Sequence, residues 1–431
     1  MSTSQATKSE STTLRRAILS SFAGTSIEWY DFFLFGSAAA LVFPRVFFPE
    51  SDPATGLLFS FMTYGVAFVM RPFGGIIFGQ LGDVLGRKNT LIATLLIMGV
   101  GTVLIGCVPG YDTLGIWSAV ILVLLRIVQG LGLGGEWGGA ATLSAEHADG
   151  AGRAANRGLL ASWMQLGVPA GNLLAVAALY IMETVLSPDS FIAWGWRIPF
   201  MASAVLIVLG FWIRAALAES PLFLATEKEK SPLRTMLRTH WRQVLITIGI
   251  RIASDVSYYV FAVFALSYIS NVLGLPASVG LIGVIVGCSL QFLVIPISAQ
   301  ISDSVGRRPV YIFGAAAVGI WAFVAWPLIA TGQVALAIAA ISIGIAAQGI
   351  MYGPMTAFIT EMFGTKVRAT GAGFGYQVAG ILGGALAPTI AQLLTQWSHS
   401  TVTVSIYVAI TAAIAIISSL LARETSGKDL S

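Results

Sequence analysis

Long apolar runs alternate with short polar segments over almost the whole of this 431-residue chain. An α-helix needs about 20 apolar residues to span the hydrocarbon core of a bilayer, and runs such as residues 90–108 and 405–422 meet that length. Only 10% of the residues are charged, whereas a soluble domain has about 25%. The ten-residue alternation typical of a membrane β-barrel is absent from the sequence. We therefore expect an all-α membrane protein.

The pattern predicts twelve transmembrane helices in two six-helix bundles. The expected spans are residues 17–43, 56–78, 90–109, 115–137, 158–184, 197–217, 242–270, 278–300, 310–330, 334–358, 369–395 and 401–422. The expected domains are a cytoplasmic N-terminal tail (1–13), an N-terminal bundle (14–217), a cytoplasmic linker (218–241), a C-terminal bundle (242–422) and a cytoplasmic tail (423–431). Most Lys and Arg residues lie on one side of these spans, which predicts a plasma-membrane protein with both termini in the cytoplasm.

Two polar loops of the N-terminal half recur in the C-terminal half. The loop "GQLGDVLGRKNT" (79–90) matches "AQISDSVGRRPV" (299–310), and "SAEHADGAGR" (144–153) matches "ITEMFGTKVR" (359–368). Two matched loops at nearly the same offset indicate a duplicated six-span unit, so the two bundles are expected to be pseudo-symmetric. Such repeats are typical of secondary transporters, in which one half rocks against the other around a central site.

Charged residues inside membrane spans usually face a cavity or one another, because lipid does not solvate them. The candidates are Glu28, Asp31, Arg126, Glu136, Arg251 and Asp255. Glu28 and Asp31 are three positions apart and share a helix face. Arg251 and Asp255 lie in the corresponding first span of the other half, so we expect both charged faces to look into one central cavity. A site of low dielectric disfavours two ionised carboxylates together, so either residue is a candidate to bind the coupling proton. Asp31 is slightly preferred.

Arginine stays charged and binds carboxylates through two parallel hydrogen bonds, so Arg126 and Arg251 are candidates to bind an anionic substrate. Alternatives remain open for both residues. Arg251 and Asp255, four positions apart, are either a substrate site or a structural ion pair. Arg126 either binds substrate or packs in its span as a partner of Glu28 or Asp31. Tyr259 and Gln377 are further substrate-binding candidates, because tyrosine and glutamine suit hydroxyl-bearing acids.

The loop at 79–91 resembles the signature loop of the major facilitator superfamily. The phrases "EWYDF" (28–32), "RPFGGIIFGQLGD" (71–83), "GGEWGGA" (134–140), "WGWRIPF" (194–200) and "GYQVAGILGG" (375–384) are similar to its metabolite:H⁺ symporter branch. That branch includes permeases for shikimate, 2-oxoglutarate, citrate, and proline or betaine. The resemblance implies a major facilitator fold. It also implies a cytoplasmic gate made of Asp83, Arg87, Glu146 and Arg153 in one half, and Asp303, Arg307, Glu361 and Arg368 in the other. Glu136 and Arg71 lie near the same side and are assigned to gating or anchoring.

The leading hypothesis is proton-coupled uptake of a small organic acid by alternating access, with the bilayer, protons and that acid as the only expected partners. The competing readings are uptake of a zwitterion such as proline or betaine, and a nutrient sensor that does not transport. Sodium is not excluded as the coupling ion. No nucleotide-binding loop, nucleophile–base set or metal-ligand spacing is found in the sequence, so we expect no enzyme, no cofactor, no metal and no nucleic-acid partner. One chain contains a complete path, which predicts function as a monomer.

Overall fold

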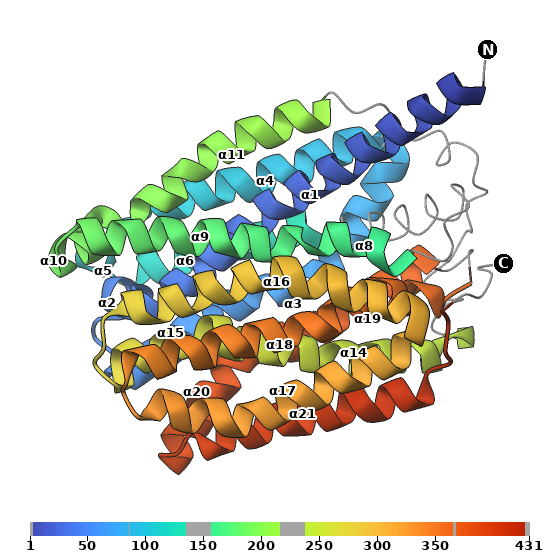
Figure 1. The fold of residues 1–431 in the computed structure, drawn as a ribbon. Helices are drawn as coiled ribbons and strands as arrows, with labels where there is room; N and C mark the ends of the chain where they lie inside the picture. The colour runs from blue at the N-terminus through green and yellow to red at the C-terminus, as the bar shows by residue number, and fades with distance from the viewer. Residues whose placement is uncertain (1–2, 86, 135–156, 216–237, 365–367, 427–431) are drawn as a thin grey trace.

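A computed structural model describes residues 3–85, 87–134, 157–215, 238–364 and 368–426, and these residues form helices joined by short turns (Figure 1). The helices of the N-terminal half are α1 (Thr3–Leu41), α2 (Phe43–Phe47), α3 (Pro53–Leu85), α4 (Arg87–Cys107), α5 (Tyr111–Leu114), α6 (Ile116–Gly134), α8 (Arg157–Gln165), α9 (Gly167–Val185), α10 (Pro188–Ser190), η2 (Phe191–Gly195) and α11 (Arg197–Ala215).

The C-terminal half follows the same plan. Its helices are α14 (Trp241–Tyr259), η3 (Val260–Phe264), α15 (Ala265–Ser267), η4 (Tyr268–Val272), α16 (Ala277–Val305), α17 (Arg307–Ala330), α18 (Val334–Glu361), α19 (Arg368–Gly380), η5 (Ile381–Ala385), α20 (Ala387–Ser398) and α21 (Val402–Leu421). The elements named η are short π-helical segments, which occur often at functional sites. Two of them begin directly after Tyr259 and Gly380.

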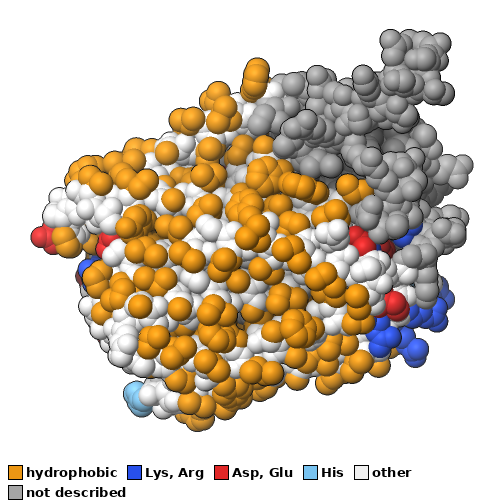
Figure 2. Space-filling model, in the orientation of Figure 1, with side chains coloured by type: hydrophobic (Ala, Val, Ile, Leu, Met, Phe, Trp, Pro, Cys, Tyr) orange, Lys and Arg blue, Asp and Glu red, His pale blue; other side chains and the backbone are white. Residues whose placement is uncertain are grey.

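Nine helical segments among the described residues are long and apolar enough to cross a membrane, and a bent pair (Pro188–Gly195 with Arg197–Trp212) makes a tenth. The other two predicted spans fall in α1 and in α4, whose described apolar part is the shorter Ile92–Cys107. Apolar side chains cover the middle of the molecule, and the charged side chains visible in the same view lie at its two ends (Figure 2). This belt identifies the lipid-facing surface of a multi-pass membrane protein.

The two halves lie side by side, with both chain termini at the same end of the bundle (Figure 1). We call this end the termini side and the opposite end the far side. Across the boundary between the halves, α8 and α9 pack against α16, α8 also packs against α18, and α3 packs against η5. The interior beside α1 is strongly aromatic, since Phe32 contacts Tyr64 and Phe68 with ring centroids 4.9 and 4.7 Å apart. The fold thus brings the first helices of the two halves to a shared centre.

Candidate functional site

A small cavity of about 20 Å³ lies between the two halves. Trp29 and Phe33 from α1 and Val168 from α9 line its N-terminal side. The C-terminal side is lined by polar and aromatic residues of α14, α16, α18 and α19: Arg251, Asp255, Tyr258, Tyr259, Gln291, Gln348, Tyr352 and Tyr376. Its wall is therefore apolar on one side and rich in hydrogen-bonding groups on the other. In this arrangement the space holds little more than a water molecule, so a substrate would need the halves to move apart before it could bind between these two faces.

Arg251 and Asp255 form an ion pair in the cavity wall. The Nε atom of Arg251 is 2.9 Å from Oδ2 of Asp255, and the side chains are almost fully buried. The Nη1 atom of Arg251 donates to the backbone oxygen of Tyr376 at 2.6 Å, and the guanidinium carbon lies 3.0 Å from the centroid of that tyrosine ring. The pairing expected from the four-residue spacing is present, and the pair also borders the cavity. The position of Arg251 and Asp255 therefore fits both a structural ion pair and a substrate site.

Two glutamines form a hydrogen-bonded chain in the same wall. Gln291 Nε2 donates to Gln348 Oε1 at 2.7 Å, and Gln348 Nε2 donates to Ser254 Oγ at 2.7 Å. This order leaves Oε1 of Gln291 as a buried acceptor that has no hydrogen-bond partner among the described residues. A buried acceptor without a donor is costly, so the cavity favours a ligand that offers an O–H or N–H group at this point.

The halves also meet directly beside the cavity and on the far side. Asn172 of α9 donates to the hydroxyl of Tyr258 on α14 at 2.8 Å. On the far side, Asn271 Nδ2 donates to the oxygen of Ala40 at 3.4 Å, and the N–H of Ser278 donates to Glu183 at 3.4 Å. Together with the contacts on the termini side described below, these bonds join the halves at both ends.

Asp31 lies outside the cavity lining, although the sequence predicted a carboxylate face toward a shared cavity. Its Oδ1 accepts a hydrogen bond from Ser203 of α11 at 2.9 Å, and Thr102 of α4 lies beside the same carboxyl group. Glu28 is buried on the same helix, with 6% of its surface exposed. The residues of this helix that line the cavity are Trp29 and Phe33 instead. Asp31 is thus held within the N-terminal half, away from the cavity wall.

Arg126 is buried near Asp31 and also lies outside the cavity lining. Its Nη1 donates to Gln129 Oε1 at 3.0 Å, and Gln129 Nε2 donates to Thr102 Oγ1 at 2.7 Å. A second donor, Nη2, bonds to the oxygen of Tyr64 at 3.3 Å. Polar groups therefore form a chain from Arg126 to the Asp31 carboxyl group. This geometry favours the reading in which Arg126 is an internal partner of Asp31.

The two remaining substrate-binding candidates differ in position. Tyr259 lines the cavity and packs edge-on against Phe68, with ring centroids 5.5 Å apart. Gln377 lies outside the lining, and its Nε2 donates to the backbone oxygen of Gly134 in the other half at 3.4 Å. We therefore keep Tyr259 as a residue of the cavity wall and place Gln377 at a contact between the halves.

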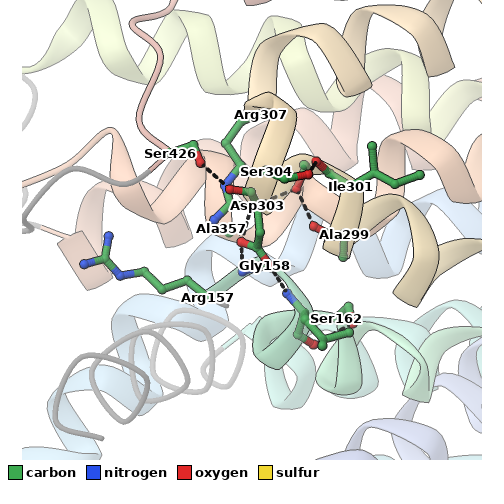
Figure 3. Close-up of polar contacts among 12 residues, drawn as sticks. Arg157, Gly158, Ser162, Ala299, Ile301, Asp303, Ser304, Arg307, Ala357 and Ser426 are labelled. Carbon is green, nitrogen blue, oxygen red and sulfur yellow. Dashed lines mark hydrogen bonds and ion pairs between the residues drawn. The ribbon is translucent and has the colours of Figure 1, made fainter. Parts of the chain in front are cut away.

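On the termini side, Asp303, Arg307 and Glu361 form a cluster, which we call the Asp303 cluster. Figure 3 shows Asp303 and Arg307 with their neighbours. Arg307 Nη1 is 2.7 Å from Asp303 Oδ1. The same guanidinium binds Glu361 side-on, with Nη2 donating to Oε1 at 3.1 Å and Nε donating to Oε2 at 3.3 Å. Three residues predicted as gate members are thus brought together by α16, α17 and α18. Arg368, a fourth predicted gate member of this half, is also buried. Its Nε donates to the backbone oxygen of Phe363 at 3.2 Å.

The Asp303 cluster binds the N-terminal half through the first turn of α8. The N–H groups of Gly158 and Leu159 donate to the two carboxylate oxygens of Asp303 at 2.8 and 3.0 Å, and Arg157 approaches Glu361 at 4.0 Å. A carboxylate at a helix N-terminus is stabilised by free N–H groups and by the helix dipole. Sequence reasoning missed these partners because they belong to the backbone and lie more than a hundred positions away.

The segment after α21 also reaches the Asp303 cluster. The carboxylate of Glu424 accepts hydrogen bonds from the N–H groups of Arg307 and Arg308 at 2.9 and 3.1 Å. Thr425 Oγ1 donates to Glu361 at 2.6 Å, and Ser426 Oγ donates to the backbone oxygen of Asp303 at 3.1 Å (Figure 3). Partial burial opposes ionisation of Glu424, but four backbone N–H groups outweigh it and lower the pKa of this carboxyl group. The sequence signal was an acid two residues after the expected end of the last span at residue 422.

Other predicted gate residues lie outside the described part of the chain. Glu136, Glu146 and Arg153 fall in the segment 135–156, and the side chains of Asp83 and Arg87 are likewise not described. The N-terminal counterpart of the Asp303 cluster therefore remains a prediction.

Comparisons with known proteins place these observations in context. The profile of the family described as "Sugar (and other) transporter" matches residues 17–241 and 229–431. The chain is 39% identical to the inner membrane metabolite transport protein YhjE of Escherichia coli K12, covering 96% of this chain and 95% of the relative. It is 39% identical to the shikimate transporter of the same strain, covering 95% of each. It is 31% identical to the E. coli K12 proline/betaine transporter, covering 97% of this chain and 85% of the relative.

The fold is similar to solved structures of a major facilitator superfamily protein. A structure of the proton:xylose symporter XylE bound to 6-bromo-6-deoxy-D-glucose aligns with a TM-score of 0.75 at 18% identity, covering 98% of each chain. An inward-open structure of XylE from E. coli aligns with a TM-score of 0.70 at 19% identity, covering 97% of this chain and 98% of that one. This similarity confirms the predicted fold class.

Proposed function

Because the chain belongs to the sugar (and other) transporter family of the major facilitator superfamily, we propose that it is a proton-coupled symporter that takes up a small organic acid by alternating access. Family membership makes the protein a transporter and not an enzyme. The observation that best supports an acid is the cavity between the halves, in which a buried arginine, Arg251, lies beside tyrosine and glutamine donors. Arginine offers a permanently charged, planar donor to a carboxylate.

The glutamine chain supports an acid that also bears hydroxyl groups. The buried acceptor Oε1 of Gln291 needs a donor from the ligand, and glycine betaine has neither an N–H nor an O–H group to offer. A hydroxylated acid such as shikimate offers both a carboxylate and several donors. The 39% identity to a shikimate transporter is consistent with this choice. A zwitterionic osmolyte is the second candidate, favoured by the 31% identity to a proline/betaine transporter.

Proton coupling is assigned to the α1 acids. Asp31 is buried, is hydrogen-bonded to Ser203, and is connected to Arg126 through Thr102 and Gln129. Protonation neutralises the Asp31 carboxylate and removes the attraction between this group and Arg126. The balance of charge inside the N-terminal half therefore changes. As the halves rock, contacts between them such as those of the Asp303 cluster then break and form again. We place the protein in the plasma membrane with its termini in the cytoplasm, acting as a monomer.

Substrate class is tested by a thermal-shift screen of the purified full chain, because a bound ligand stabilises the folded state. The panel contains shikimate, 2-oxoglutarate, citrate, aromatic acids, proline and glycine betaine. We expect shikimate or another hydroxylated acid to raise the apparent Tm most. A response to glycine betaine or proline alone rejects the organic-acid assignment and supports the osmolyte reading.

Coupling is tested by uptake of the radiolabelled hit into proteoliposomes with an imposed proton gradient. A protonophore should abolish accumulation, and sodium-free buffer should leave it unchanged. Asp31→Asn is expected to prevent gradient-driven accumulation but preserve exchange of bound substrate, with Glu28→Gln tested in parallel. Asp189→Asn is the matched control, because Asp189 is exposed. Normal accumulation in both the Asp31 and Glu28 variants would reject the assignment of coupling to these acids.

A further inference from the structure

Arg71 on α3 is a buried cation that has no role in the transport mechanism proposed above. Only 2% of its surface is exposed, and its Nε and Nη2 atoms have no hydrogen-bond partner among the described residues. Its guanidinium carbon lies 4.3 Å from the ring centroid of Phe68, 4.4 Å from that of Phe32 and 5.3 Å from that of Trp29. The aromatic faces offset part of the cost of burying the charge. They provide no acceptor for its N–H groups.

The buried arginines nearby have polar partners. Arg251 is paired with Asp255, and Arg126 donates to Gln129 and to a backbone oxygen. Within the described residues, the ion pairs found do not include Arg71. An arginine inside the membrane usually faces a partner or a functional cavity. Arg71 is therefore a charge whose partner is best sought outside the described part of the protein.

The unsatisfied atoms of Arg71 define the shape of that partner. Nε and Nη2 form one edge of the guanidinium group, and this edge matches the two oxygens of a carboxylate. The same chain shows the same arrangement elsewhere, because Arg307 uses Nε and Nη2 to bind the two oxygens of Glu361. A single carboxylate would thus satisfy both donors of Arg71 and its charge.

Arg71 lies next to the cavity and to the boundary between the halves. Trp29 both lines the cavity and contacts the Arg71 guanidinium. A methyl group added at Gly380 of the C-terminal half would lie 3.6 Å from Phe68 and 3.7 Å from Nη2 of Arg251, so the Phe68 ring lies near both arginines. Because α3 packs against η5 of the other half, separation of the halves at this contact would uncover the face that holds Phe68 and Arg71.

We propose that Arg71 binds the carboxylate of the transported molecule from the N-terminal half, opposite Arg251 in the C-terminal half. The inference rests on the proposed transport function but not on the choice between acid and osmolyte, since shikimate, proline and glycine betaine all have a carboxylate. In the arrangement described here, the side chains of Trp29, Phe32 and Phe68 lie against Arg71, which is buried. Movement of Trp29 or of the halves opens the route from the cavity to it.

The test measures binding of five carboxylates to the full chain in detergent by thermal shift: shikimate, 2-oxoglutarate, citrate, proline and glycine betaine. The ligand that binds wild type best is then compared with its neutral methyl ester. Arg71→Gln should weaken binding of the carboxylate by about 30-fold or more, as loss of a buried charge pair does, and should leave the weaker binding of the ester unchanged. Arg71→Lys keeps the positive charge but lacks the paired Nε and Nη2 donors, so it should recover part of the affinity.

Arg242→Gln is the matched control, because Arg242 is an exposed arginine on α14. The inference is overturned if Arg71→Gln binds the carboxylate as tightly as wild type, if carboxylate and ester lose affinity by the same factor, or if no carboxylate binds wild type. If Arg71→Gln fails to fold, Arg71→Lys provides the test. Wild-type affinity for the carboxylate in Arg71→Lys would reject binding through the two guanidinium donors Nε and Nη2. A wild type that prefers glycine betaine rejects the organic-acid function, while the Arg71 variants still test the carboxylate site.

Discussion

Gly158 allows a close approach of the two halves on the termini side, and Gly158→Ala is expected to push them apart there. Its N–H donates to Asp303 at 2.8 Å. A methyl group at this position would lie 2.9 Å from the backbone oxygen of Ala299 and 2.9 Å from Oδ1 of Asp303, and it would also overlap with Arg307. Side-chain methyl carbons essentially never approach other atoms this closely. Backbone movement is therefore required, because the oxygen of Ala299 belongs to a helix.

The size of the effect follows from two contributions. Overpacking of a close contact costs about 1–3 kcal/mol, and the displaced N–H groups weaken hydrogen bonds to a charged acceptor, each worth about 1.5–3 kcal/mol. Since the shift stretches these bonds but does not abolish them, we expect about 2–4 kcal/mol against the closed arrangement. That corresponds to a change of about 30- to 1000-fold in the ratio of closed to open molecules at this end.

The assay is a distance measurement between two spin labels at exposed positions on the termini side, one at Asn89 on α4 and one at Ser304 on α16. In Gly158→Ala the distance distribution should shift to longer values, and uptake into proteoliposomes should slow. Gly364→Ala is the control, because no heavy atom lies within 4 Å of the position that its methyl group would take. An unchanged distribution in Gly158→Ala would refute the claim that this contact holds the halves together.

Three further perturbations test other contacts. Glu424 has a lowered pKa in the folded protein, so its contribution to docking of the last segment is present above its ordinary pKa of about 4.5 and is lost as pH falls through the lowered value. The protection of residues 422–426 against hydrogen exchange, relative to the unfolded chain at the same pH, should therefore fall in acid, and Glu424→Gln should remove that pH dependence. Asn172→Leu removes the donor to the Tyr258 hydroxyl and should weaken ligand binding several-fold by thermal shift, whereas equal affinity would show that this contact does not shape the cavity. Gly384→Ala places a methyl group 2.5 Å from Phe68, which should cost about 1–3 kcal/mol and lower the apparent Tm; an unchanged Tm would mean that α3 and η5 adjust freely.

Local pattern was sufficient for the fold and for contacts within one helix. Apolar runs of membrane-spanning length identified the helices, and the repeated loops indicated two related halves. The four-residue spacing of Arg251 and Asp255 predicted that they share a helix face, and the structure places them 2.9 Å apart. These results depend on the helical period and on the thickness of the bilayer, both of which act on a single segment.

Contacts between helices were decided by tertiary structure. The sequence predicted Glu28 and Asp31 on a shared cavity, but the rotation of α1 turns Trp29 and Phe33 toward it and Asp31 toward Ser203 of α11. The environment of Arg71 was equally inaccessible, because its aromatic neighbours and empty donors depend on how α1 and α3 pack. Helical period states which residues share a face. Which faces meet depends on the packing of every helix at once. This packing determines the cavity, the aromatic surroundings of Arg71 and the contact of Gly158 with the other half.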